Sequence, residues 1–262
     1  MEQNKSSIIL LATGGLLVMI GALLTYIFLP PQVVEVRDVE SGAMNALTYR
    51  WSAPDDYERA PRTYDTLIPL PQPDITGTTP VESVIQSRRS ARSFAAESLN
   101  LEQVAQMLWA GIGISSEDGK RTAPSPGSAH PTSLFLVAEN VDGLASGLYE
   151  YIEAEHALGL VRAGSFIADW ESITQQPYPM NAPAVALVTG DMYTHYHRFG
   201  TASERLVAQE SGHIGQNLYL QAESLGLGMI VMGGIDTAAG QEFVGTPVHE
   251  PVLYLIPFGI AE

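Results

Sequence analysis

The distribution of apolar, polar and turn-forming residues divides the chain into four segments. Residues 1–7 form a short N-terminal tail, and residues 8–29 form a largely apolar run without a charged side chain. About 20 apolar residues suffice to span a bilayer core as a helix. Residues 30–79 carry recurrent prolines and predict a linker or an extended arm. The remaining residues, 80–262, have the helix and strand patterns of a folded domain.

Four helices are predicted in the folded domain. The first two begin with capping-box spacing, in which a polar residue precedes a glutamate or glutamine by three positions. These boxes are Thr79–Glu82, with Pro80 at the first helical position, and Asn100–Gln103. The second helix is expected to end at Gly111. The other two are the longest helix, over residues 202–225, and a short helix over residues 237–243.

Short apolar runs predict six strands. Two of them, residues 148–151 and 158–161, are expected to form a hairpin. The other four cover residues 133–138, 184–189, 229–232 and 252–257. Because helices and strands follow one another without regular alternation, the order predicts a layered α+β domain rather than a doubly wound one.

Composition excludes several classes of function. The 262 residues include no cysteine, so disulfides, thiolate metal sites and cysteine nucleophiles are excluded. The formal net charge of −16 disfavours non-specific nucleic-acid binding, which depends on basic surface, and disfavours flat binding to anionic lipid. We therefore expect no nucleic-acid partner.

The apolar run over residues 8–29 is interpreted as a retained single-pass membrane anchor. A cleaved signal peptide is the alternative, but no small-x-small cleavage site precedes Pro30 and Pro31. Lys5 before the run and Arg37 after it favour an N-terminus inside the cytoplasm by a small margin. This orientation places the folded domain outside the cytoplasm, and the side of the membrane stays open.

A basic cluster, Ser87-Arg88-Arg89-Ser90-Ala91-Arg92, stands out in this acidic chain. The planar guanidinium group fits phosphate oxygens, so the cluster indicates a phosphate-bearing ligand. A solvated surface patch is the alternative.

Two further segments could contact the rest of such a ligand. The proline-rich loop over residues 122–131 could lie flat against an aromatic ring, or be a simple turn. Gly233 and Gly234 could offer main-chain N–H groups, although their segment lacks a dinucleotide-binding fingerprint.

The histidines indicate a function less clearly than the basic cluster does. His213, on the longest predicted helix, is interpreted as a hydrogen-bonded core residue, with a catalytic acid or base as the alternative. His195 and His197 have the spacing of a metal pair on a strand, but no other metal motif accompanies them, and no metal is expected. Nothing in the sequence specifies a serine hydrolase or a glycosidase.

Taken in order, several segments resemble the nitroreductase-like flavoproteins, and in particular the SagB-type branch that includes thiazoline and oxazoline oxidases. The resemblance covers about residues 80–259. It is carried by Ser87–Phe94, Leu101–Gly111, Arg121–Ser125, Gly147–Tyr149, Gly212–Ala222 and Leu225–Gly228.

The resemblance implies an α+β fold with a mixed sheet flanked by helices, which binds FMN at the interface of a homodimer. It implies that Arg88, Arg89, Ser90 and Arg92 hold the phosphate, ribityl chain and pyrimidine edge. Pro124, Ser125 and Pro126 would approach the flavin from the other subunit. Gly233 and Gly234 would lie beside its reactive nitrogen. The implied activity is transfer of hydride or electrons through the flavin to a small-molecule or peptide substrate, with NAD(P)H or the substrate itself as donor.

The chain departs from this family pattern at two places. Its last residues, Pro257–Glu262, lack the basic residue that often helps to hold the phosphate. Azoline oxidases tend to carry a Lys-Tyr pair before the long helix, where this chain has Arg198-Phe199. Azoline oxidation during maturation of a peptide natural product is therefore an alternative function. A flavin-binding interaction module without turnover is another.

Overall fold

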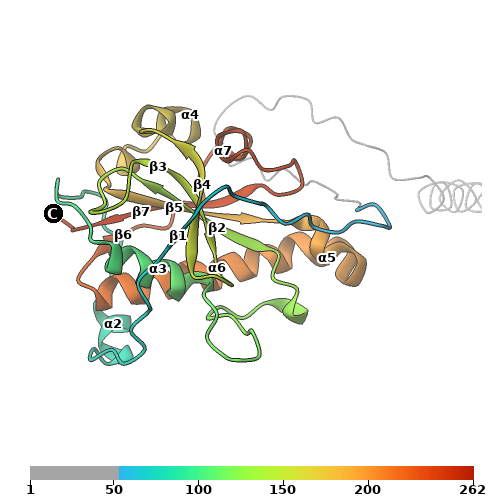
Figure 1. The fold of residues 1–262 in the computed structure, drawn as a ribbon, viewed down its shortest axis with the longest axis horizontal. Helices are drawn as coiled ribbons and strands as arrows, with labels where there is room; N and C mark the ends of the chain where they lie inside the picture. The colour runs from blue at the N-terminus through green and yellow to red at the C-terminus, as the bar shows by residue number, and fades with distance from the viewer. Residues whose placement is uncertain (1–52) are drawn as a thin grey trace, which may run out of the picture. The chain divides into compact units, whose positions relative to one another are not determined.

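The computed structural model describes residues 53–262 (Figure 1). The predicted membrane anchor, residues 8–29, lies outside the described residues, as do residues 30–52 of the predicted arm. Within residues 53–262, no helix is both long enough and apolar enough to cross a membrane.

A seven-stranded sheet forms the centre of the domain, in the order β1-β4-β3-β2-β5-β7-β6. Every pairing between these strands is antiparallel, so the expectation of a mixed sheet is wrong. Neighbouring strands β2, β3 and β4 follow one another along the chain through short connections, and antiparallel pairs need no crossover helix. The strands are β1 Leu67–Pro69, β2 Thr132–Ala138, β3 Gly147–Ile152, β4 Ala157–Ala163, β5 Ala184–Gly190, β6 Gly228–Met229 and β7 Val252–Gly259.

Helices cover both faces of the sheet. In Figure 1, α3 and α6 lie on one side, while α4 and α7 lie on the other. Side chains alternate along β2: Leu134 and Leu136 belong to the core cluster with α3 and α6, whereas Phe135 belongs to the second cluster. This double coverage explains why β2 and β5 are buried along their whole length. The α-helices are α2 Val81–Ser87, α3 Leu101–Ile112, α4 Trp170–Ile173, α5 Met192–Phe199, α6 Ser203–Ser224 and α7 Thr237–Val244.

The two predicted capping boxes have different outcomes. The box of α3 is confirmed, since Asn100 and Gln103 bond reciprocally at its start. The box of α2 is wrong: Pro80 is the N-cap residue, and no side chain caps the helix. Gly111 does not end α3, which continues to Ile112. A Cβ at Gly111 would lie 3.0 Å from Leu134, so this glycine lets the helix pack closely on the sheet.

A segment of the predicted arm, residues 57–64, lies across the sheet and is called the strap below. Arg62 donates hydrogen bonds to Glu150 at 2.6 Å and to Glu250 at 2.5 Å. Arg59 donates to Glu250 at 2.7 Å. Both glutamates are buried, and buried carboxylates need such partners to remain charged. The strap therefore neutralises acidic groups that the folded domain buries.

Two tyrosines extend this contact. The hydroxyl of Tyr57 donates to Asp191 at 2.5 Å, and that of Tyr64 donates to Glu150. Burial, followed by the hydrogen bond to Asp191, raises the pKa of Tyr57 above its ordinary value. Burial and Glu150 raise the pKa of Tyr64 in the same way. Both phenols thus remain hydrogen-bond donors at neutral pH. Beyond the strap, β1 pairs with β4 and leads the chain towards α2.

We expect Arg62→Ala to lower the free energy of unfolding by about 2–3 kcal/mol. The substitution leaves the buried Glu150 without a charged partner and leaves Glu250 paired with Arg59 alone, while the 28% exposure of the arginine side chain reduces the full cost. Urea unfolding at pH 7.5 measures the change. Lys120→Ala is the control, because it breaks an ion pair whose side chains are 75% and 60% exposed. We expect this variant to lower the free energy of unfolding by less than about 0.5 kcal/mol. Equal effects would contradict the neutralising role of the strap.

Candidate functional site

Tyr219 on α6 joins two of the segments singled out in the sequence. Its hydroxyl lies 2.8 Å from Ser90 Oγ and accepts a hydrogen bond from the Val231 amide at 3.1 Å. The Arg88 guanidinium lies over its ring, 4.8 Å from the centroid. The basic cluster and the glycine-rich segment therefore meet on one side of α6.

Main-chain contacts reinforce this junction. Ser90 forms a parallel bridge with Met229, and the Ala91 amide donates to the Met229 carbonyl at 2.9 Å. Gly215 on α6 faces Val231, and an added Cβ would lie 3.3 Å from that side chain. A small residue at this position lets the glycine-rich segment approach the helix. Arg88 and Ser90 thus belong to the same surface as the segment that leads to Gly233 and Gly234.

Gly233 and Gly234 present free main-chain donors. Both residues are exposed. Among residues 53–262, no group accepts a hydrogen bond from either amide. A Cβ at Gly234 would meet nothing within 4 Å, whereas one at Gly233 would lie 3.2 Å from Tyr254. Two adjacent N–H groups beside open space can donate to a ligand.

Arg89 and Arg92 point to other contacts. Arg89 folds back and donates to the carbonyls of Gln86, Ser87 and Arg88, which end α2 without other helical partners. Arg92 lies 5.8 Å from the centroid of the Tyr178 ring. Both arginines are exposed. Of the four predicted phosphate-site residues, the structure brings only Arg88 and Ser90 together at Tyr219.

The proline-rich loop lies on the opposite flank of α6. Asn217 donates to the Thr122 carbonyl at 3.2 Å, and His213 Nδ1 lies 3.4 Å from the Pro124 carbonyl. At 3.6 residues per turn, His213 and Asn217 project roughly 160° away from Gly215 and Tyr219. Within one chain, the predicted residues Pro124, Ser125 and Pro126 are therefore separated by α6 from Arg88 and Ser90.

Side chains of α5 hold this loop in place. His195 Nε2 lies 3.0 Å from the Pro126 carbonyl, and Arg198 donates to the Gly127 carbonyl at 3.0 Å. Gly127 has φ of +64°, which glycine adopts readily. His195 and His197 lie on the helix α5 and not on a strand, where their spacing could have formed a metal pair. No cluster of three metal-binding side chains occurs in residues 53–262.

A buried polar cluster lies beneath the loop. His195 and Glu210 are almost fully buried. His130 Nδ1, His195 Nδ1 and Glu210 Oε2 are buried without a hydrogen-bond partner. Burial, and next the charge of Arg121, lower the pKa of His130 below its ordinary value. His213, by contrast, is exposed, so its interpretation as a core residue is wrong.

The sequence profile of the Nitroreductase family matches residues 85–260. The chain belongs to the nitroreductase family. The nitroreductase-family protein MJ1384 of Methanocaldococcus jannaschii is 30% identical over 182 residues, which cover 68% of this chain and 90% of that protein. Membership confirms the predicted family and α+β fold, and it supports the prediction of an FMN-dependent oxidoreductase.

Two solved structures share the fold. A nitroreductase-family protein from Ralstonia eutropha JMP134 is 26% identical, with a TM-score of 0.66, covering 78% of this chain and 93% of that one. A chain of the Escherichia coli microcin synthetase McbBCD complex, with truncated pro-MccB17 bound, is 17% identical. It has a TM-score of 0.59 and covers 95% of this chain and 94% of that one. At this identity the second likeness concerns the fold alone.

Three features of the site were missed in the sequence. Tyr219 follows Gly215 by one helical turn, and this spacing could have indicated a shared face. Arg198 was noted only as a departure from a family motif, although it holds the loop. The aromatic residues Tyr57 and Tyr64 favour an arm packed on the domain, but the partners Glu150 and Glu250 could not be predicted because they lie far away in sequence.

We expect the stability of the protein to fall as the pH drops below about 6.5, in part because of His130. Its pKa is lower in the folded state than in the unfolded chain, so acid protonates the unfolded chain first and favours unfolding. His130→Gln should reduce this loss between pH 7.5 and pH 5.5, as measured by urea unfolding at each pH. A variant with the pH dependence of the wild type would contradict this assignment.

Proposed function

We propose that the domain binds FMN at the interface of two copies of the chain and transfers hydride or electrons between NAD(P)H and a second substrate. One observation carries this proposal. The stretch that contains Arg88 and Ser90 pairs with the segment that leads to the two free amides of Gly233 and Gly234. This arrangement places phosphate-binding groups and main-chain donors on one surface, as FMN requires.

The residues present fit FMN. Arg88 is partly buried and forms no ion pair with the carboxylates of residues 53–262, so its charge is available to a phosphate. Ser90 would add a hydroxyl, and Arg89 and Arg92 would add exposed cations nearby. The amides of Gly233 and Gly234 would donate to the ring system. FMN supplies the redox chemistry when bound, while these residues orient it.

Residues 257–262 include no basic side chain. The Ala95 amide donates to the Ile260 carbonyl at 2.9 Å, and Ala261 forms a bridge with Phe94. Residues 260 and 261 therefore lie beside the segment that follows the basic cluster.

The two flanks of α6 support a homodimer. A ligand bound beside Arg88 and Gly233 cannot reach Pro124–Pro126 of the same chain around α6, but it can reach the loop of a second copy. Apolar side chains also remain exposed near the basic cluster: Ile75 is 78%, Val81 53% and Ile85 57% exposed. Ile75 and Val81 border a cleft of about 730 Å³ between α2, α3, α6 and residues 72–79. A partner subunit would cover them.

The membrane anchor remains part of the proposal on sequence grounds. Residues 8–29 carry no charge and have the length of a transmembrane helix. Residues 30–79 would then connect this anchor to the domain, and the strap would fix the connection on the sheet. The weak charge bias favours a domain outside the cytoplasm.

Assignment to the SagB-type branch, with oxidation of a peptide azoline, is the second candidate function. The microcin synthetase chain shares the fold over 95% of this protein, and its complex holds truncated pro-MccB17, which suggests a peptide as the substrate to test. Arg198 and Phe199 disfavour azoline oxidation, because they provide neither a titratable amine nor a phenol. Oxidation of a synthetic thiazoline peptide to the thiazole by the FMN-loaded protein would establish it.

Arg88→Ala should raise the dissociation constant of FMN by about ten- to a hundredfold, because a charge-assisted phosphate contact is lost. Flavin fluorescence titration of the apoprotein measures the constant. Arg205→Ala is the matched control, since Arg205 is an exposed arginine on α6. An unchanged constant in the Arg88 variant would remove Arg88 from the cofactor site.

Mixing two defective variants tests the shared site. Arg88→Ala damages one half of each site, and Pro124→Trp, at an exposed loop position, damages the other half. If the halves come from different subunits, random pairing of the two variants restores about a quarter of the sites. Co-expression with two affinity tags isolates the mixed dimers, in which one of the two sites is intact, so about one bound FMN per mixed dimer is expected. No restoration would contradict a site built from two subunits.

A further inference from the structure

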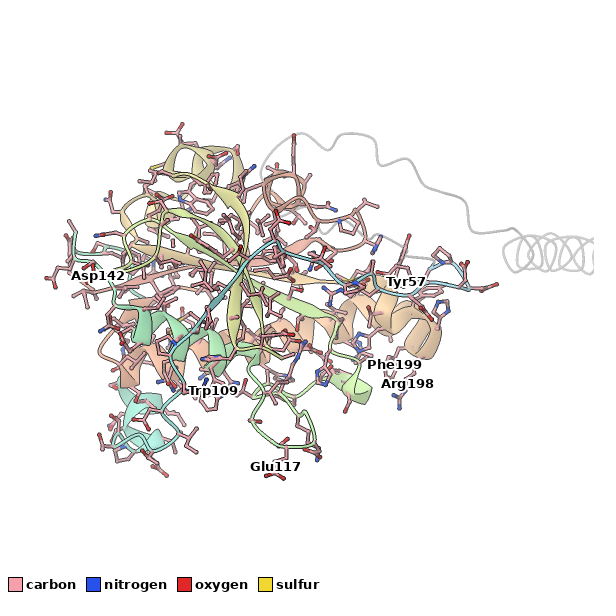
Figure 2. All side chains as sticks on the ribbon, viewed as in Figure 1. Tyr57, Trp109, Glu117, Asp142, Arg198 and Phe199 are labelled. Carbon is pink, nitrogen blue, oxygen red and sulfur yellow. The ribbon has the colours of Figure 1, made fainter. Side chains whose placement is uncertain are left out.

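Arg198 occupies a defined position at the end of α5. Figure 2 shows Arg198 and Phe199 side by side there, on the side of the molecule that carries the loop. Arg198 Nη1 donates to the Gly127 carbonyl at 3.0 Å, and its guanidinium lies 5.3 Å from the centroid of the Phe199 ring. The hydrogen bond uses one of five N–H donors, so most of the guanidinium group remains available.

The loop is shaped to receive this side chain. A Cβ at Gly127 would lie 2.5 Å from Arg198 Nη1 and 3.2 Å from Phe199 Cζ. The absence of a side chain at Gly127 lets the guanidinium rest on the loop backbone. Phe199 also packs against the buried ring of His195, with centroids 5.2 Å apart. The contacts with Gly127 and Phe199 limit the movement of Arg198 before any ligand arrives.

Arg198 has no acidic partner among residues 53–262. Four other cations of this region form ion pairs with carboxylates: Arg59, Arg62, Lys120 and Arg121. In a chain of net charge −16, an anionic ligand is repelled unless a local cation attracts it. A preset, unpaired and exposed guanidinium supplies such attraction.

We propose that Arg198 binds an anionic group, carboxylate or phosphate, on the substrate that reacts at the cofactor. This inference rests on the proposed function, because it is the loop of Pro124–Pro126 that places Arg198 beside the cofactor of the partner subunit. The free N–H donors bind the anion, and the hydrogen bond to Gly127 keeps them in position. The arginine thereby selects acidic substrates over neutral ones of the same shape.

Ligand binding to the FMN-loaded protein tests this role without turnover. The probes are 4-nitrobenzoate and 4-nitrobenzamide, which differ in charge but have similar shapes, and NADP⁺ and NAD⁺, which differ by one phosphate. Dissociation constants are obtained from changes in the flavin absorbance. We expect the wild type to bind at least one anionic probe about tenfold more tightly than its counterpart, as an added charge-assisted contact implies.

Three variants separate charge from loop positioning. Arg198→Gln keeps an N–H donor for the Gly127 carbonyl but removes the charge, and it should bring the preference to about one. Arg198→Lys keeps the charge and should keep part of the preference. Arg205→Gln removes an exposed charge on α6 and should leave the preference unchanged. The FMN content of each variant is measured first.

Each outcome has a defined meaning. Loss of the benzoate preference in Arg198→Gln assigns the anion to the acceptor substrate, and loss of the NADP⁺ preference assigns it to the nucleotide donor. If neither preference exists in FMN-loaded wild type, or if Arg198→Gln retains it, Arg198 only holds the loop and the inference is wrong. A wild-type protein that binds no FMN would overturn the proposed function as well.

Discussion

Helix α6 is the element on which the rest of the site depends. It is packed against the sheet through Ile214, Leu218 and Ala222, which are buried in the core shared with α3. This packing fixes its rotation, and its two remaining flanks therefore face fixed directions. One flank carries Gly215 and Tyr219, and the other carries His213 and Asn217. Rotation of the helix would move both halves of the candidate site at once.

The separation of the two flanks has a chemical consequence. Charged and main-chain donors gather on the Tyr219 side, while the rigid proline-rich loop lies on the Asn217 side. Neither half alone encloses a ligand, and α6 prevents the two halves of one chain from meeting. The site that we propose is completed by a second subunit, and it would place Arg198 of one copy near the cofactor held by the other. The same helix thus separates the halves and positions each of them.

Electrostatics of the buried interior impose a second constraint. The domain buries Glu150, Asp191 and Glu250 on the face crossed by the strap, although the chain already carries an excess of acidic residues. Burial of unpaired carboxylates is costly, so the strap residues Arg59 and Arg62 are needed to complete the fold. The strap is therefore part of the folded domain. It also leads the chain past β1 and Gln106 to α2, which precedes the arginines of the basic cluster.

The sequence by itself determined the elements whose signals are local. The box at Asn100, the hairpin of β3 and β4 and the long helix α6 follow from side chains within a few residues of one another, and all are present in the structure. The family motifs likewise indicated the segments from which the proposed site is built. Strand direction, the ends of α2 and α3, and the exposure of His213 were not determined in this way. Each depends on neighbours distant in sequence: Gly111 stays helical because it packs on Leu134, and Arg198 acquires its place from Gly127. Only the tertiary structure decided which residues meet, because burial and pairing are properties of the packed chain rather than of any one segment.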